Sequence, residues 1–424
     1  MTRESVDPLG DACRGLKHRL ALWLGFGLHS DPPVSHLEHI VVGDAHLTRN
    51  ASSRVGEDLA KLMARHRGAS FVFAGDLIDL AHESIHDEPL RAIRAVVDAH
   101  PAFRTAFGEH LANGGNVTLL AGNHDDVIAT EAGTKTFLDA LGLDARDRAN
   151  VKTSPWFVRL GERGEIHVEH GHHYDADNAM PHPLAPPDPE WWSLGIALMH
   201  RFVAPSGAGA LVHENGAQPL HLLKRAWELY GKRAPEVIST YLLAAAHQVR
   251  SAGPNYPSAR AKELGDAAVA KFADSMGLEP AMVRKIIEAG AKPTMESIRA
   301  TFLRLYWDRA LATGVMVTAG ASALLGGPGK KIALGAAAVL VTSIATSGNR
   351  YSDRVHRAME EQGRWLAEAT DAKAVVFGHI HVPTEHGVYK NTGSFGFPGR
   401  APGRPYVRID DATAETHRGF FATG

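Results

Sequence analysis

The chain has 424 residues, of which 44% are hydrophobic and 22% charged, and its formal net charge is -2. That length can bury a sizeable core in one large domain or two, while the near-neutral charge excludes a global field for nucleic acid, so we expect no nucleic acid partner. The single cysteine, Cys13, rules out an intramolecular disulfide and agrees with a reducing cytoplasm.

The N-terminal segment contains an apolar run, Leu20–Leu28, directly after Lys17, His18 and Arg19. This has the shape of a signal peptide. However, acidic residues come before the basic ones, and no small-x-small cleavage site follows. We therefore favour a short amphipathic helix packed on the domain and predict an N-terminal helical extension over residues 1–35.

Strand and helix patterns alternate in the first third of the chain. β-type stretches occur at His39–Val42, Phe71–Ala74 and Val117–Leu120, and helical runs separate them around Val55–Arg67 and Glu88–His100. A hairpin-like pair of strands follows, and the C-terminal part is again rich in β-type stretches. These are Trp156–Leu160, Glu165–Glu169, Ala374–Phe377, Gly387–Asn391, Tyr406–Ile409 and about Thr416–Phe421.

Five short motifs rich in Asp, Asn and His end apolar runs. They are Gly43-Asp44-Ala45-His46, Gly75-Asp76-Leu77-Ile78-Asp79, Gly122-Asn123-His124-Asp125, Glu169-His170-Gly171-His172 and Gly378-His379-Ile380-His381. An open α/β sheet builds its site from residues that follow the strands in this way. Two Asp, one Asn and four His are more ligands than one metal ion needs. They suit two ions that share a bridging carboxylate, the arrangement that clamps an in-line phosphoryl displacement.

The five motifs, in this order, resemble the calcineurin-like metallophosphoesterases. The family pattern is D-x-H, G-D-x-x-D, G-N-H-D, a lone H and G-H-x-H, and the chain carries every part. The resemblance covers residues 36–180 and 371–424, which we take as the catalytic domain. It implies an α+β fold with two stacked sheets in a sandwich, flanked by helices.

The resemblance also implies a role for each motif residue. One ion would be held by Asp44, His46 and His381, the other by Asn123, His170 and His379, with Asp76 bridging the two. Mixed oxygen and nitrogen ligands suit Mn, Fe, Zn or Co.

The nucleophile implied by the resemblance is a hydroxide bridging the two metals. His124 would donate a proton to the leaving oxygen or stabilise the phosphoryl group. Asp125 could orient the His124 imidazole, and Asp79 is a second residue that could support the ligands.

Other polar residues near the motifs leave alternatives open. His172 could replace His170 as the ligand. His82 and His86 could contact substrate or lie on a solvated helix face. Arg49 and Arg54 follow the first motif, so they could clamp phosphate or carry ordinary surface charge.

Residues 181–370 form a predicted α-helical insertion between the fourth and fifth motifs. A cluster of prolines marks its start, and apolar residues then recur at helical spacing. Because the insertion emerges near the metal site, it could act as a cap that selects substrate. The alternative is a scaffold that only buries itself.

An apolar hairpin, residues 310–347, lies within the insertion. Ala310–Leu325 and Ile332–Ser347 carry no charge, and a Gly-Pro turn with Lys330 and Lys331 separates them. Each run has about sixteen residues, or roughly 24 Å as a helix. That is shorter than the roughly 20 residues that a helix needs to span a bilayer. A membrane-embedded hairpin and a buried soluble hairpin both remain open.

The predicted function is a dinuclear metal-dependent phosphoesterase that hydrolyses a phosphoester or pyrophosphate bond. The segment His173-Tyr174-Asp175 resembles the UDP-2,3-diacylglucosamine hydrolases, which suggests a lipid-linked or nucleotide-sugar substrate, although that branch has Arg in place of His124 and a shorter insertion. The alternatives are an inactive membrane-associated scaffold with this fold, or a protein phosphatase. We expect a cytoplasmic protein, attached to the cytoplasmic face of the membrane if the hairpin binds lipid.

Overall fold

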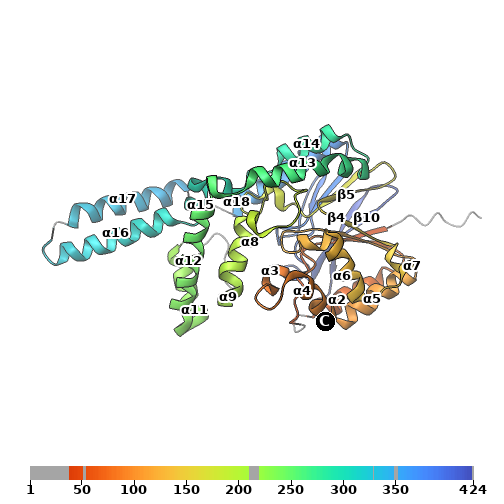
Figure 1. Cartoon of the computed structure of the whole chain (residues 1–424), viewed down its shortest axis with the longest axis horizontal. Coiled ribbons are helices and arrows are strands. Elements are labelled where there is room, and N and C mark those ends of the chain that lie inside the picture. The colour runs from red at the N-terminus through yellow and green to blue at the C-terminus, as the bar shows by residue number, and fades with distance from the viewer. Residues whose placement is uncertain (1–37, 51–53, 210–218, 328, 348–351, 423–424) are drawn as a thin grey trace, which may run out of the picture. The chain divides into compact units, whose positions relative to one another are not determined.

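The computed structural model describes residues 38–50, 54–209, 219–327, 329–347 and 352–422. The predicted N-terminal extension and Cys13 lie outside these residues. Residues Glu38–Gly424 form one compact unit, built from two sheets with helices on their outer faces (Figure 1). This confirms the predicted two-sheet architecture with an additional helical region.

The first sheet has six strands in the order β11-β10-β1-β2-β3-β4. The strands β1 to β4 are parallel to one another, and β10 runs antiparallel to β1. Their bounds are β1 Glu38–Val42, β2 Ser70–Ala74, β3 Asn116–Leu120, β4 Val151–Ser154, β10 Arg404–Asp410 and β11 Thr416–Phe421.

The second sheet has five strands in the order β5-β6-β7-β9-β8, with β6, β7 and β9 parallel. Their bounds are β5 Phe157–Leu160, β6 Ile166–Glu169, β7 Ala374–Phe377, β8 Thr384–His386 and β9 Tyr389–Asn391.

Alternating residues of each strand face two different cores. In β1, Val41 packs between the two sheets with Val168 and Val376, whereas Ile40 and Val42 face the helices outside the first sheet. This period of two is the pattern of a strand buried on both faces. The helices outside the first sheet are α2 Val55–Arg65, α3 Leu80–Glu83, α4 Pro89–Ala99, α5 Pro101–Ala112, α6 Glu131–Leu141 and α7 Ala145–Arg148.

The insertion is helical, as predicted. It contains α8 Leu194–Leu198, a π-helix Met199–Val203, α9 Ala204–Ser206, α11 Pro219–Tyr230, α12 Ala234–Ser251, α13 Ser258–Ser275, α14 Pro280–Ala289, α15 Ile298–Arg304, α16 Trp307–Leu324, α17 Gly329–Ser347 and α18 Ser352–Thr370. Within the described ranges, none of the helices combines the length and the apolar character needed to cross a membrane.

Part of the insertion covers the outer face of the second sheet. Phe272 of α13, Ile286 of α14 and Met359 of α18 share one buried cluster with Phe157 of β5 and Phe377 of β7. The outer packing of the second sheet therefore depends on residues of its own strands and on residues of the insertion. These three helices therefore cover the outer face of the second sheet as well as burying their own apolar side chains.

We predict that Phe272→Ala destabilises the whole compact unit Glu38–Gly424. The Phe272 ring is buried and lies 4.9 Å from that of Phe157 and 5.8 Å from that of Trp156. Its truncation should lower the free energy of unfolding by about 3–5 kcal/mol, measured by urea denaturation. Leu264→Ala, an exposed position on the same helix, is the control and should have little effect. Equal stability of the two variants would show that α13 does not support the sheet.

Candidate metal centre

Five strand ends of the two sheets supply the motif residues. Asp44 follows β1, Asp76 follows β2 and Asn123 follows β3, all in the first sheet. His170 follows β6 and His379 follows β7 in the second sheet. The strands β1, β2 and β3 are parallel, as are β6 and β7, so each sheet presents these carboxyl ends at one edge.

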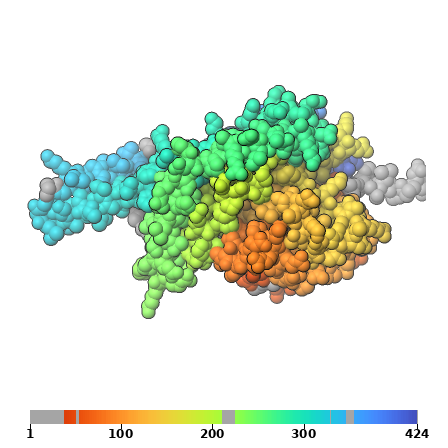
Figure 2. All heavy atoms as spheres, in the orientation of Figure 1, coloured from red at the N-terminus to blue at the C-terminus, as the bar shows by residue number. Residues whose placement is uncertain are grey.

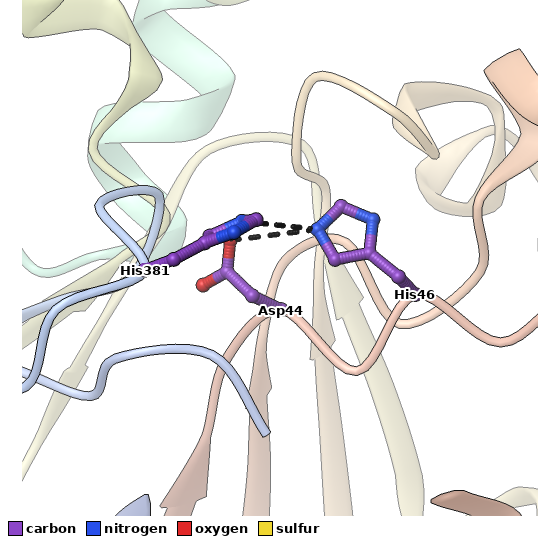
Figure 3. A group of neighbouring side chains, drawn as sticks. All are labelled: Asp44, His46 and His381. Carbon is purple, nitrogen blue, oxygen red and sulfur yellow. Dashed lines mark hydrogen bonds and ion pairs between the residues drawn. The ribbon is translucent and has the colours of Figure 1, made fainter. Parts of the chain in front are cut away.

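Asp44, His46 and His381 form the first group of converging side chains (Figure 3). Nε2 of His381 lies 3.3 Å from Oδ1 of Asp44 and 3.3 Å from Nε2 of His46. That Asp44 oxygen is buried and has no hydrogen-bond partner among the described residues. Two imidazole nitrogens and an unsatisfied carboxylate oxygen that face one another suit a cation between them.

Asp76 joins this group to a second one. Three sets of side chains have ligand atoms within 4.8 Å of one another, and Asp76 belongs to two of them, with His46 and His124 and with Asp44 and His170. Its Oδ2 lies 3.2 Å from Nε2 of His170 and 3.8 Å from Nε2 of His46. A carboxylate within reach of both groups has the position that a bridging ligand requires.

Asn123 and His379 complete the surroundings of His170. Oδ1 of Asn123 lies 3.0 Å from Nε2 of His170, and the rings of His379 and His170 are 5.3 Å apart. Nε2 of His379 lies 3.0 Å from a carboxylate oxygen of Asp175. A metal-binding histidine commonly gives its other ring nitrogen to a carboxylate in this way. Asp175 thus fixes the orientation of His379.

Backbone strain is concentrated at these residues. Among the described non-glycine residues, eight have a positive φ, and four of them are Asp44 (54°), His46 (47°), Asp76 (53°) and His379 (69°). Such conformations cost about 1–3 kcal/mol each and persist where the surroundings impose them, commonly at functional sites. The orientation of these side chains thus lowers the stability of the loops after β1, β2 and β7.

Glycine is required at position 122 because of the Asp76 carboxylate. A Cβ atom on Gly122 would lie 2.0 Å from Oδ1 of Asp76 and 2.5 Å from its backbone nitrogen. The loop after β3 can approach Asp76 closely only without a side chain there. This close approach also lets the backbone N–H of His124 donate to Oδ1 of Asp76 at 2.8 Å.

His124 pairs with Asp79. Nδ1 of His124 lies 2.8 Å from Oδ1 of Asp79. Burial opposes the charge of His124, but Asp79 and Asp76 together raise its pKa to about 10. The imidazole is therefore protonated at neutral pH, and Asp79 directs Nδ1 so that Nε2 remains for another partner.

Asp125 does not orient His124, contrary to the sequence-based expectation. Its carboxylate instead accepts hydrogen bonds from the backbone N–H groups of Asp76, Leu77, Ile78 and Gly122, at 2.8–3.2 Å. The side chain of Asp125 thus ties the loop after β2 to the loop after β3. The orienting contact with His124 belongs to Asp79, the other residue that the sequence indicated.

The other polar residues that the sequence singled out lie in different environments. His170, and not His172, shares a set with Asp76 and Asp44. Arg49 forms ion pairs with Glu83 and Asp87, which occupy its guanidinium. His86 is exposed, and His82 uses its backbone N–H to cap α3 through Asp79. Arg54 is exposed at the N-cap of α2.

Three aromatic residues near the centre have no signal in the motifs. Phe397 is 44% exposed, and its ring lies 5.5 Å from that of His46 and 6.0 Å from that of His381. In the insertion, Trp192 stacks on His200 with ring centroids 3.8 Å apart. Burial and the nearby charge of His124 lower the pKa of His200 to about 4. Only the tertiary fold places these residues beside the site.

The donor set fits divalent metal ions. Asp44 and Asp76 are buried carboxylates, and the neighbouring histidines hold the pKa of each below its ordinary value although burial opposes this. Asp76 and its neighbours in turn raise the pKa of buried His170 to about 9. Mixed carboxylate, amide and imidazole donors suit first-row transition metals. A cation bound here would balance the charge of the two carboxylates.

Comparison with known proteins agrees with this geometry. The sequence profile of the family described as calcineurin-like phosphoesterase matches residues 39–226, which include the first four motifs. A search among curated proteins found no match. The profile match and the two-sheet fold with Asp and His clusters at its strand ends show that this part of the chain is similar to the calcineurin-like phosphoesterases.

Proposed function

We propose that the chain is an active hydrolase that cleaves a phosphoester or pyrophosphate bond with two divalent metal ions. The position of Asp76 carries this proposal, because its Oδ2 lies 3.2 Å from Nε2 of His170 and 3.8 Å from Nε2 of His46, one histidine of each proposed ion. An inactive scaffold would have no need to keep a strained, buried and complete ligand set. That argument favours the enzyme over the scaffold alternative.

The ligands divide between two ions in this proposal. One ion lies with Asp44, His46 and His381, the other with Asn123, His170 and His379, and Asp76 contributes to both. When bound, the ions supply an activated water and neutralise charge on the phosphoryl group. Mn, Fe, Zn and Co all suit these donors.

The protein's own contribution to the reaction is the His124–Asp79 pair. The proton on His124 is stabilised by Asp79 and Asp76. With Nδ1 directed at Asp79, His124 donates that proton from Nε2 to the leaving oxygen. Asp79 itself keeps its charge, because His124 holds its pKa below the ordinary value despite burial.

The surroundings of the centre support an amphipathic phosphorylated substrate. A cavity of about 480 Å³ lies between residues 174–177 and helices α15 and α18 of the insertion. Asp175, which holds His379, forms part of its wall, together with the polar residues Arg304 and Arg354 and the apolar residues Leu303 and Val355. Arg304 pairs with Asp177 of the same wall, so Arg354 and the apolar side chains are the groups that suit a lipid-linked or nucleotide-sugar phosphate.

A substrate panel on metal-loaded protein tests the proposed activity. The panel contains an aryl monoester, an aryl diester, nucleotide-sugar pyrophosphates, phospholipid head groups and a phosphopeptide. Turnover of the lipid-linked or nucleotide-sugar compounds would support the substrate class. Preference for the phosphopeptide would favour a protein phosphatase, and no turnover with any of several metals would favour the scaffold.

The first prediction for the site concerns Asp76→Asn. The substitution removes a negative charge that both ions share, so at least one metal should be lost and turnover should fall by several orders of magnitude. Elemental analysis and an aryl phosphate assay measure the two effects. Glu109→Gln, an exposed carboxylate on α5, is the control. A variant that retains two ions and normal turnover would refute the bridging assignment.

The second prediction separates proton donation from metal binding. His124→Ala should retain both ions and lower turnover by roughly 100- to 10,000-fold, the usual contribution of a positioned acid. The loss should be largest for alkyl leaving groups, which need protonation most. His86→Ala, an exposed histidine, serves as the control. If aryl and alkyl esters lose the same factor, His124 stabilises the phosphoryl group and does not act as the acid.

A further inference from the structure

The α16–α17 hairpin is fixed at its base by polar contacts. Arg309 is buried and donates hydrogen bonds to Oγ and the carbonyl oxygen of Ser343, and Oγ of Ser343 donates to Asp308. Arg309 also lies over the Tyr306 ring at 4.9 Å. These contacts hold the two antiparallel helices together where they leave α15. The hairpin is therefore a built element with a defined geometry.

The apolar side chains beyond this base are exposed. Figure 2 shows the surface of α16 and α17, which no other described segment covers on the face in view. Leu324 and Leu325, at the turn, are 89% and 90% exposed. The sequence left open a hairpin that is buried in the protein, and these exposures contradict that alternative for the described residues.

Opposite faces of the same helix are apolar and exposed. In α17, Ile332 and Val339 lie seven residues apart and so share one face, whereas Leu334 lies about 200° around the helix from Ile332. Ile332, Leu334, Val339 and Val341 are 57–64% exposed. A single folded partner covers one face of a helix. A medium that surrounds the hairpin is needed to cover both.

The charges of the hairpin point to the kind of medium. Between residues 310 and 347 the only charged side chains are Lys330 and Lys331, and both are exposed beside the turn. Acidic residues are absent from this span of the sequence. Lysine can place its apolar stem in hydrocarbon and its ammonium group at the level of lipid phosphates. The combination fits an anionic lipid surface better than a protein surface, where a polar rim is usual.

We propose that the α16–α17 hairpin inserts into one leaflet of a bilayer containing anionic lipids. Leu324, Leu325 and the exposed residues of α17 nearest the turn enter the upper acyl region without crossing the membrane. Lys330 and Lys331 bind the phosphates of the head groups. This binding does not depend on the proposed hydrolase activity, and the metal ligands lie outside the hairpin.

Flotation of the full chain with vesicles tests the insertion. Vesicles of phosphatidylcholine alone and of phosphatidylcholine with phosphatidylglycerol are compared at low and high salt. The chain should bind both, more tightly to the anionic vesicles. High salt should reduce that preference but leave apolar binding, because salt screens charge and not burial. Binding that high salt abolishes completely would overturn insertion in favour of a purely electrostatic contact.

Substitutions at the turn supply the decisive comparison. The double variant L324D/L325D should lower vesicle binding by at least about tenfold, because charged side chains are costly in hydrocarbon. Leu243→Asp, at an exposed leucine of α12, is the matched control and should bind as the native chain does. K330Q/K331Q should lose only the preference for anionic vesicles. Unchanged circular dichroism and aryl phosphate turnover would show that each variant is folded.

A second copy of the chain is the competing occupant. The alternative predicts self-association that rises with protein concentration, is measured by sedimentation in the absence of vesicles and is lost in L324D/L325D. That result, together with no vesicle binding by the native chain, would overturn the proposal. A Leu325→Trp probe gives an independent reading. Its fluorescence should shift to shorter wavelength and be quenched by brominated acyl chains, and an unshifted spectrum would exclude insertion.

Discussion

The charge of Asp76 is the constraint around which the centre is arranged. This carboxylate is buried where the strand ends of the two sheets meet, and a buried charge is costly unless it is balanced and hydrogen-bonded. The N–H of His124 satisfies one oxygen, and His170 and His46 face the other. Burial opposes the charge of His170, but Asp76 and its neighbours raise its pKa to about 9. Removing the charge of Asp76 would leave the surrounding imidazoles without the carboxylate charge that they face.

The position of Asp76 depends in turn on the backbone conformation and hydrogen bonds of the adjoining loops. Asp125 binds four backbone N–H groups and so locks the turn that carries Asp76. Gly122 removes the one Cβ that would collide with the Asp76 oxygen. Asp76 itself holds a left-handed conformation. These features preorganise the ligands, because the cost of aiming them is met by folding and not at the moment of binding.

The sequence indicated which side chains converge because each motif follows a strand whose end is fixed by the sheet. Asp44, Asp76 and His170 therefore converge as soon as the strand order is known. Spacing could not distinguish Asp79 from Asp125 as the partner of His124, since that depends on how a turn folds. Asp175 lies just after the fourth motif, but no motif indicates its contact with His379. Phe397 and His200 lie outside the motifs and carry no periodic signal. Only their tertiary placement shows that they lie beside the centre.

The insertion divides according to how its apolar residues are buried. In α13, α14 and α18 they complete the packing of the second sheet, so these helices belong to the core. In α16 and α17 the apolar residues beyond Arg309 remain exposed, although the base of the hairpin is held by buried polar contacts. Both parts connect through α15, which also lines the cavity next to Asp175. Closely packed helices move little relative to one another. The base of the hairpin would therefore keep the centre at a fixed distance from any surface that the hairpin enters.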